Sequence, residues 1–83
     1  MTLLTRIQDS SERLTASDRR IIEVLLGQQG EVVFLSAAQL AERARVHETT
    51  ATRLAQKLGF GGYPELRAQL QKEMMAGQDA AAR

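Results

Sequence analysis

Hydrophobic residues recur with helical spacing over most of the chain, which predicts a series of short amphipathic helices. Across residues 1–14 the aliphatic side chains fall near one face and the polar ones on the other, so we expect a first helix of about three turns. Thr15 is expected to cap the start of a second, mostly buried helix, with Asp18 in its first turn. This helix is expected to end at Gly27.

The apolar run at residues 31–35 is too short to identify from its periodicity. It could form a strand, but no second run in the chain provides a partner, and a lone strand leaves its backbone groups unpaired. We therefore expect a helical turn or an extended connector packed on the core.

The clearest local signal is a capping box formed by Ser36 and Gln39, each of which can bond the backbone N–H of the other. Leu35 before the cap and Leu40 after it complete a hydrophobic staple. Together these residues predict a third helix at residues 37–44.

A turn at residues 45–47 leads into a fourth helix at residues 48–58, which Gly59 ends in a left-handed conformation. Pro64 is expected at the first position of a fifth helix, where its missing N–H costs nothing. Residues 77–83 lose the apolar face and are expected to form a linker or a disordered tail.

Composition supports an all-α fold of about five helices. Alanine and leucine contribute 23 residues, whereas the β-branched isoleucine and valine contribute 7. The 83 residues suffice for one domain, which we place at residues 1–76. No apolar run approaches the roughly 20 residues that span a membrane, and the N-terminus lacks a secretory leader, so we expect a cytoplasmic location.

The available residue types argue against an enzyme. There is no cysteine, and His47 is the only histidine, so neither a thiolate site nor a zinc site is expected. The sequence also lacks a Ser/His/Asp set at plausible spacing and a glycine loop that could cradle phosphates. We expect no enzymatic activity and no cofactor.

Residues 37–58 have the pattern of a helix-turn-helix unit, in which two short helices meet across a tight turn. The positions where these helices must touch each other or the core are all apolar or small: Leu40, Ala41, Ala44, Val46, Ala51 and Leu54. An alanine-rich helical hairpin without a DNA-binding function meets the same requirement, so that alternative stays open.

The opposite side of the fourth helix is polar. Most of the polar residues of this helix lie there; the full set is Thr49, Thr50, Thr52, Arg53, Gln56 and Lys57. Three closely spaced threonines weaken a helix, whereas threonine, arginine and glutamine are side chains that read base edges in the major groove. Residues 36–63 hold four basic and two acidic residues, a weak further indication of nucleic acid. The alternative is a solvated face with no partner.

The segments LAERARVHETTATRLAQKLGF and GGYPELR, at residues 40–60 and 61–67, resemble the N-terminal domain of RpiR-type transcriptional regulators. The resemblance covers residues 3–75. It implies a five-helix domain that binds specific DNA sequences and regulates genes, with sugar or amino-sugar metabolism as the expected targets. Members of this family usually continue into a sugar-isomerase-type domain that binds a phosphosugar effector. That domain is absent from this sequence, so we expect no effector-binding residue here.

Two departures from the family pattern fall in the turn. Arg45 stands where the family usually has glycine, and His47 where serine usually caps the next helix. Because a left-handed arginine is costly, we expect a reshaped turn. Because serine is a good helix cap, we expect a less well capped fourth helix with His47 in its place. The fourth helix also departs from the usual residues at Ala51, Thr52, Leu54 and Gln56. These changes leave the target DNA sequence open.

The polar residues of the fourth helix each have a candidate DNA contact. Arg53 is the first candidate for a base contact, to guanine, or for a close phosphate contact. Thr49 and Thr52 are candidates for contacts with thymine methyl groups or with phosphates. Thr50 matches the family motif but is expected to be half-buried. Gln56 could pair with adenine or face water.

Three further residues have competing interpretations. Lys57 is expected to touch a phosphate, although the helix dipole alone also favours a lysine near a helix C-terminus. His47 lies at the entry to the fourth helix, where it either meets a phosphate or serves only as a substitute cap. For Tyr63 we prefer packing against the turn at Pro64 over donation to a phosphate.

We expect double-stranded DNA as the partner, and a homodimer through the first or the fifth helix, because one recognition helix makes few contacts. The terminal helices carry apolar residues that a small core is not expected to absorb: Leu3, Leu4, Ile7, Leu70, Met74 and Met75. The alternative is a dimerisation or protein-interaction module that does not bind DNA.

Overall fold

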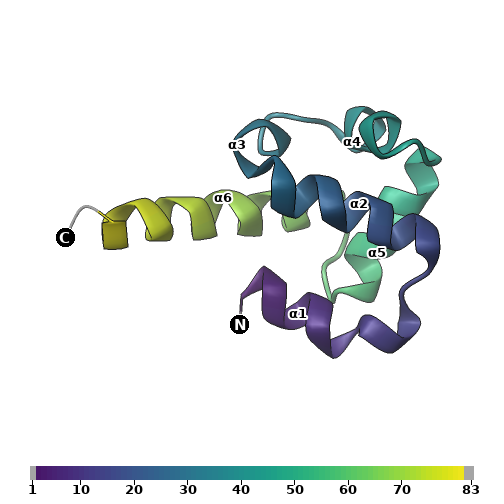
Figure 1. Cartoon of the computed structure of the whole chain (residues 1–83), viewed down its shortest axis with the longest axis horizontal. Coiled ribbons are helices and arrows are strands. Elements are labelled where there is room, and N and C mark those ends of the chain that lie inside the picture. Colours follow the sequence, from purple (N-terminus) through teal and green to yellow (C-terminus); the bar gives the residue numbers. More distant parts are fainter. Residues whose placement is uncertain (1, 82–83) are drawn as a thin grey trace.

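Within residues 2–81, the part of the chain that the structure describes, the regular structure is entirely helical. A computed structural model gives the elements in this order: α1 (Leu3–Asp9), a 3₁₀ turn η1 (Ser11–Arg13), α2 (Ala16–Gly27), α3 (Gln29–Val32), α4 (Ala37–Ala44), α5 (Glu48–Lys57) and α6 (Tyr63–Ala81) (Figure 1). The expected all-α fold is confirmed, with one short helix more than the five expected.

The expected first helix is split into two pieces. Its α-helical part ends at Asp9, and Ser10 caps it by donating its backbone N–H to the Arg6 carbonyl at 3.1 Å. A 3₁₀ turn follows before the extended Leu14. Two successive serines favour such a break, because their hydroxyls compete with the helix for backbone groups. The Ser10 hydroxyl instead donates to the Lys57 carbonyl at 3.2 Å, which places the break beside the end of α5.

The apolar run at residues 31–35 forms part of α3 and the turn after it, so the helical alternative is the correct one. The backbone N–H groups of Phe34 and Leu35 continue the turn by donating to the carbonyls of Glu31 and Val32. Val32 and Val33 are buried in the core, whereas the Phe34 side chain is 80% exposed. A single helical turn therefore supplies two core residues without leaving a strand edge unpaired.

The last helix begins one residue earlier than expected, at Tyr63, and extends further. It continues to Ala81, so residues 77–81, expected to form a linker or a tail, are helical, and the rest of the expected tail lies outside the described residues. α6 leaves the bundle on the side opposite the turn between α4 and α5 (Figure 1). The C-terminal part of the domain therefore lies away from the start of α5.

α4 and α5 pack against each other and against α2, as a helix-turn-helix unit requires. The expected capping box at the start of α4 is present: the Ser36 N–H donates to Gln39 Oε1 at 2.9 Å, and the Gln39 N–H donates to Ser36 Oγ at 3.2 Å. Five of the six expected contact positions are buried and Val46 is half-buried; the buried ones are Leu40, Ala41, Ala44, Ala51 and Leu54.

The turn keeps its left-handed geometry in spite of Arg45, so the expected reshaping is wrong. Arg45 has φ 59° and ψ 46°. Its N–H donates to the Glu42 carbonyl at 3.1 Å, and the Val46 N–H donates to the Ala41 carbonyl at 2.9 Å, which satisfies the last carbonyls of α4. Close contact between α4 and α5 fixes this path, and the cost falls on the backbone of Arg45. Gly59 ends α5 as expected, with φ 94°.

A charged pair is buried between the start of α2 and the end of α5. The Asp18 carboxylate is almost completely buried and accepts hydrogen bonds from Lys57 Nζ at 2.6 Å and from the Thr15 backbone N–H at 2.9 Å. Burial raises the pKa of Asp18, but the hydrogen bonds from Lys57 and Thr15 outweigh it and hold the pKa below its ordinary value of 3.8.

We expect Arg45→Gly to stabilise the domain by about 0.5–1 kcal/mol, because glycine adopts a positive φ without steric cost. In a domain of this size that corresponds to a rise in Tm of about 2–8 °C in thermal unfolding. Arg45→Ala is the matched control, since it removes the same side chain but keeps the strained backbone. An equal gain in both variants would show that the side chain, not the backbone, carries the cost.

We expect Asp18→Asn to lower the free energy of unfolding at pH 6–7 by about 1–3 kcal/mol. This loss lies between that from breaking an exposed ion pair and that from breaking a fully buried one. Because the folded pKa of Asp18 is depressed, the ionised carboxylate stabilises the fold above the unfolded pKa, and this stability is lost as the pH falls through the folded pKa. The gap in Tm between wild type and variant should therefore be full at pH 6 and shrink below about pH 4. A gap that is constant from pH 6 to pH 3 would contradict the ion pair.

Candidate nucleic-acid interface

α5 is held on the domain by one apolar side and exposes a polar one. Ala51, Leu54 and Ala55 are buried with 1% exposure or less. Thr49, Arg53 and Gln56 are all exposed and follow one another at i, i+4 and i+7, which places them on one face of the helix. We call these three residues the reading face. They are the sequence-predicted site residues that the structure brings together in an accessible row.

The other predicted residues of α5 lie at the edges of this face. Thr50 is half-buried, as expected, and Thr52 is half-buried as well. Lys57 is directed into the domain: its ammonium donates to Asp18 and, at 3.2 Å, to the Arg13 carbonyl. The structure therefore gives Lys57 a role in packing α5 against α2, a role that helical periodicity does not reveal.

His47 caps the start of α5. Its Nδ1 accepts the Thr49 backbone N–H at 3.1 Å, so His47 does act as a substitute cap, and a phosphate contact through the rest of the ring stays a prediction. An accepting Nδ1 means that the neutral ring carries its proton on Nε2. The exposed imidazole thus combines a cap on one nitrogen with a hydrogen-bond donor on the other.

Thr52 faces a groove of about 480 Å³ where the starts of α4 and α6 meet α5. Ser36, Glu48 and Arg67 also line it. Tyr63 is buried, and its hydroxyl donates to the Leu35 carbonyl at 3.0 Å, so the side chain is engaged within the fold. An Arg67 nitrogen donates to the same carbonyl at 3.3 Å.

Arg67 is a basic residue beside α5 that the sequence analysis did not nominate. Arg67 lies four residues after Tyr63, which places both on the same face of α6, and this spacing is the feature of the sequence that could have identified it.

The basic character of residues 36–63 is smaller at the surface than the sequence indicates. Arg43 forms an ion pair with Glu31 and also donates to Gln28 Oε1 at 2.8 Å. Lys57 pairs with Asp18. Two of the four basic residues of this segment are thus engaged by acidic partners from other helices. Arg45 and Arg53 remain exposed beside the start and the middle of α5.

Two further kinds of site are absent from the described residues. No group of three or more His, Cys, Asp or Glu residues there is placed to hold a metal ion. None of the described helices is long and apolar enough to cross a membrane.

The sequence matches the helix-turn-helix domain of the rpiR family over residues 1–77. It is 36% identical to the HTH-type transcriptional regulator HexR of Pseudomonas aeruginosa PAO1, over 90% of this chain and 26% of that protein. It is 37% identical to the uncharacterized HTH-type transcriptional regulator YfhH of Escherichia coli K12, over 94% of this chain and 27% of that protein.

The HTH-type transcriptional regulator HexR of Escherichia coli K12 is 30% identical, over 93% of this chain and 27% of that protein. The chain thus spans about a quarter of the length of these relatives. No solved structure matches it. The helix-turn-helix geometry and the match over residues 1–77 agree, and the chain belongs to the rpiR family of helix-turn-helix transcriptional regulators.

Proposed function

We propose that this domain binds specific double-stranded DNA sequences by placing α5 in the major groove. The observation that carries the proposal is the reading face, where Thr49, Arg53 and Gln56 are exposed in one row on a helix seated by apolar residues. Major-groove recognition requires a rigidly held helix with hydrogen-bonding side chains along its free side.

The geometry supports a division of roles among the polar residues. Arg53 and Gln56 have the side chains for bidentate contacts to guanine and adenine. Thr49 and Thr52 suit thymine methyl groups or phosphates, with Thr52 reaching from the groove edge. The Nε2–H of His47 suits a phosphate at the start of α5. We assign Lys57 to the fold rather than to the DNA, because its ammonium is paired with Asp18.

The resemblance to the family also supports a proposal for the biological setting. We propose that the targets are genes of sugar or amino-sugar metabolism and that the regulator acts in the cytoplasm. A phosphosugar effector would bind a sugar-isomerase-type domain outside the sequence described, and no residue here is assigned to it.

We expect Arg53→Ala to weaken binding to a preferred duplex by about 1–3 kcal/mol and to relax the preference at one base pair. The duplex is one enriched by the wild-type domain from a random pool, and affinities are measured by fluorescence titration at fixed salt. Arg19→Ala is the matched control, because Arg19 is an exposed arginine of α2 in a hollow beside α1.

Equal losses in Arg53→Ala and Arg19→Ala would show a general charge effect and contradict the assigned face. Binding by the wild type must also weaken steeply as salt rises, since DNA binding releases counterions. Binding that is insensitive to salt would favour the alternative of a protein-interaction module.

We further propose that two copies of the domain associate through an apolar surface formed by α1, α2, α3 and α6. The core absorbs more than expected: Leu3, Ile7 and Leu70 are buried, which corrects the expectation that they are surplus. Among the residues that the structure describes, the large apolar side chains left exposed are Leu4, Leu26, Phe34 and Met75.

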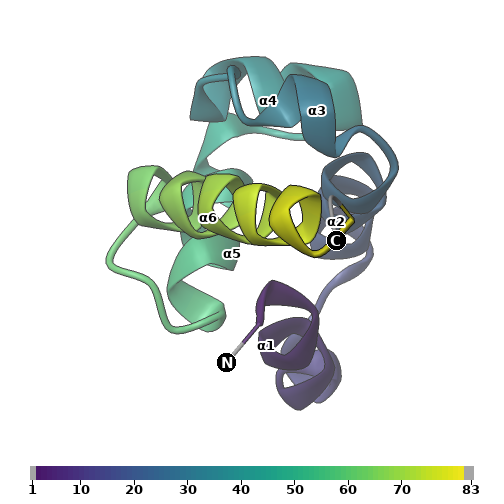
Figure 2. The same ribbon diagram turned by 90° about the vertical axis from the view of Figure 1, so that its left-hand side faces the viewer.

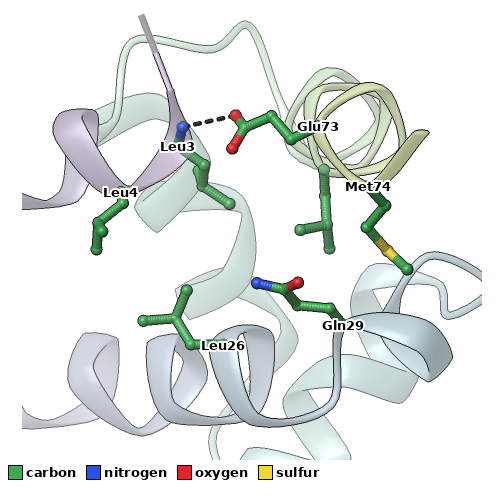
Figure 3. A pocket seen from close by; sticks show the side chains of 7 residues that line it. Leu3, Leu4, Leu26, Gln29, Glu73 and Met74 are labelled. Carbon is green, nitrogen blue, oxygen red and sulfur yellow. Dashed lines mark hydrogen bonds between the residues drawn. The ribbon is translucent and has the colours of Figure 1, made fainter. Parts of the chain in front are cut away.

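Two hollows in this surface share the half-buried Met74. Figure 3 shows one of them, where Leu4, Leu26 and Met74 surround an opening between α1, the end of α2 and α6. The surface is therefore continuous from α1 to α3. A two-fold dimer formed there would present two copies of α5, which need a separation of about 34 Å to read two half-sites.

We expect a dimer in sedimentation velocity at rising concentration, and a shift to monomer in the double variant Leu4→Glu/Met75→Glu, because charges do not tolerate burial in an apolar interface. Ala38→Glu is the control, since it adds a charge at an exposed position of α4, a helix that lines neither hollow of the apolar surface. A wild-type domain that stays monomeric at high concentration, with and without DNA, would rule out the dimer.

A further inference from the structure

We propose that the α1–η1 segment positions the recognition helix for base reading, with Arg6 and Ser10 as positioning residues that hold the C-terminal end of α5. This inference rests on the proposed function, in which α5 reads the major groove. Figure 2 shows α1 beside the end of α5, with α6 above them. Neither Arg6 nor Ser10 belongs to the helix-turn-helix unit, and both lie about fifty residues before their contacts in the sequence.

The polar contacts fall on the carbonyls that a helix leaves without partners at its end. The Ser10 hydroxyl donates to the Lys57 carbonyl at 3.2 Å, and an Arg6 nitrogen donates to the Leu58 carbonyl at 3.0 Å. Ser10 is 5% exposed, which makes it one of the few buried polar residues of the described chain. Two successive carbonyls at the end of α5 are therefore capped by α1 and the residue that follows it.

Arg6 also fits closely against the chain that leaves α5. Its guanidinium carbon lies 4.7 Å from the centre of the Phe60 ring, a cation–π arrangement. A Cβ added to Gly59 would lie 2.7 Å from an Arg6 nitrogen. The left-handed Gly59 thus provides both the turn and the space for the guanidinium.

This placement has a cost, because the Arg6 Nε–H is buried and has no hydrogen-bond partner. Arg6 is therefore held against Leu58 and Phe60 although one of its own donors is left unsatisfied.

The same segment holds α5 from a second direction and is itself anchored. Lys57 donates to the Arg13 carbonyl of η1, in addition to its pair with Asp18. At the other end of α1, the Leu3 N–H donates to Glu73 of α6 at 2.6 Å, as the dashed line in Figure 3 shows. The contacts at the end of α5 are therefore made by a segment that is itself fixed to α6, while the Lys57–Asp18 pair ties the same end of α5 to α2.

Base reading depends on this placement because recognition contacts tolerate displacements of only about 0.5 Å and 10–20°. Gln56 precedes the first capped carbonyl directly, and Arg53 lies one turn before Lys57. The start of α5 is fixed by the His47 cap, so we expect removal of the α1 contacts to displace mainly the last turn. We expect specific contacts to suffer more than phosphate contacts, which adapt through flexible side chains.

The test uses Ser10→Ala and Arg6→Met, each compared with wild type on a duplex enriched by wild type from a random pool and on a duplex of random sequence. Titrations are made about 20 °C below the Tm of each variant, so that all proteins are folded. We expect the affinity for the enriched duplex, divided by the affinity for the random duplex, to fall about tenfold. A loss of this size corresponds to one lost base contact. The affinity for the random duplex should change less than about twofold, with an unchanged salt slope, because no phosphate contact is lost.

Arg13→Met is the matched control, since it removes an exposed arginine from the same segment but keeps the backbone carbonyl that Lys57 uses. We expect its affinity ratio to equal that of wild type. Arg6→Lys keeps a donor and should recover part of the ratio.

Two outcomes would overturn the proposal while leaving DNA binding intact. A lower Tm with an unchanged affinity ratio would mean that Arg6 and Ser10 only stabilise the fold. A salt slope reduced by about one in Arg6→Met would mean that Arg6 contacts a phosphate directly. If the wild type enriches no sequence, the proposed function fails first, and the positioning role fails with it.

Discussion

A helix of ten residues is too short to be stable alone in water, so α5 depends on the domain beneath it for its shape and place. That constraint accounts for much of the architecture. One side of α5 consists of small and aliphatic residues, which let α4 and α2 approach closely. Only the opposite side remains free for a ligand. Each polar residue on the free side is therefore tolerated because the buried side supplies the stability.

Sequence analysis succeeded where the deciding contacts are local. The Thr15 cap and the capping box at Ser36 join residues three positions apart, so the residue types alone predict them, and both are present. The left-handed end of α5 at Gly59 was predictable for the same reason. Helical periodicity also identified the exposed row on α5, because the register of one helix follows from its own sequence.

Sequence analysis failed where long-range contacts decide. Lys57 has the position of a phosphate ligand within its own helix, but its partner Asp18 lies 39 residues earlier. Arg43 likewise forms an ion pair with Glu31 on α3. The core also absorbed Leu3 and Leu70, because α6 approaches α1, which no local pattern encodes. Net charge counted along a segment therefore overstated the basic surface near α5, since ion pairs between helices consume part of it.

The two ends of α5 are fixed by different kinds of interaction. At the start, the cap of His47 and the turn at Arg45 involve only neighbouring residues, and a change there alters where the helix begins. At the end, the carbonyls and Lys57 bind groups from α1, η1 and α2, so the last turn reflects the packing of the whole domain. Substitutions far from α5 in sequence can therefore alter its C-terminal half, while its N-terminal half depends on residues close by.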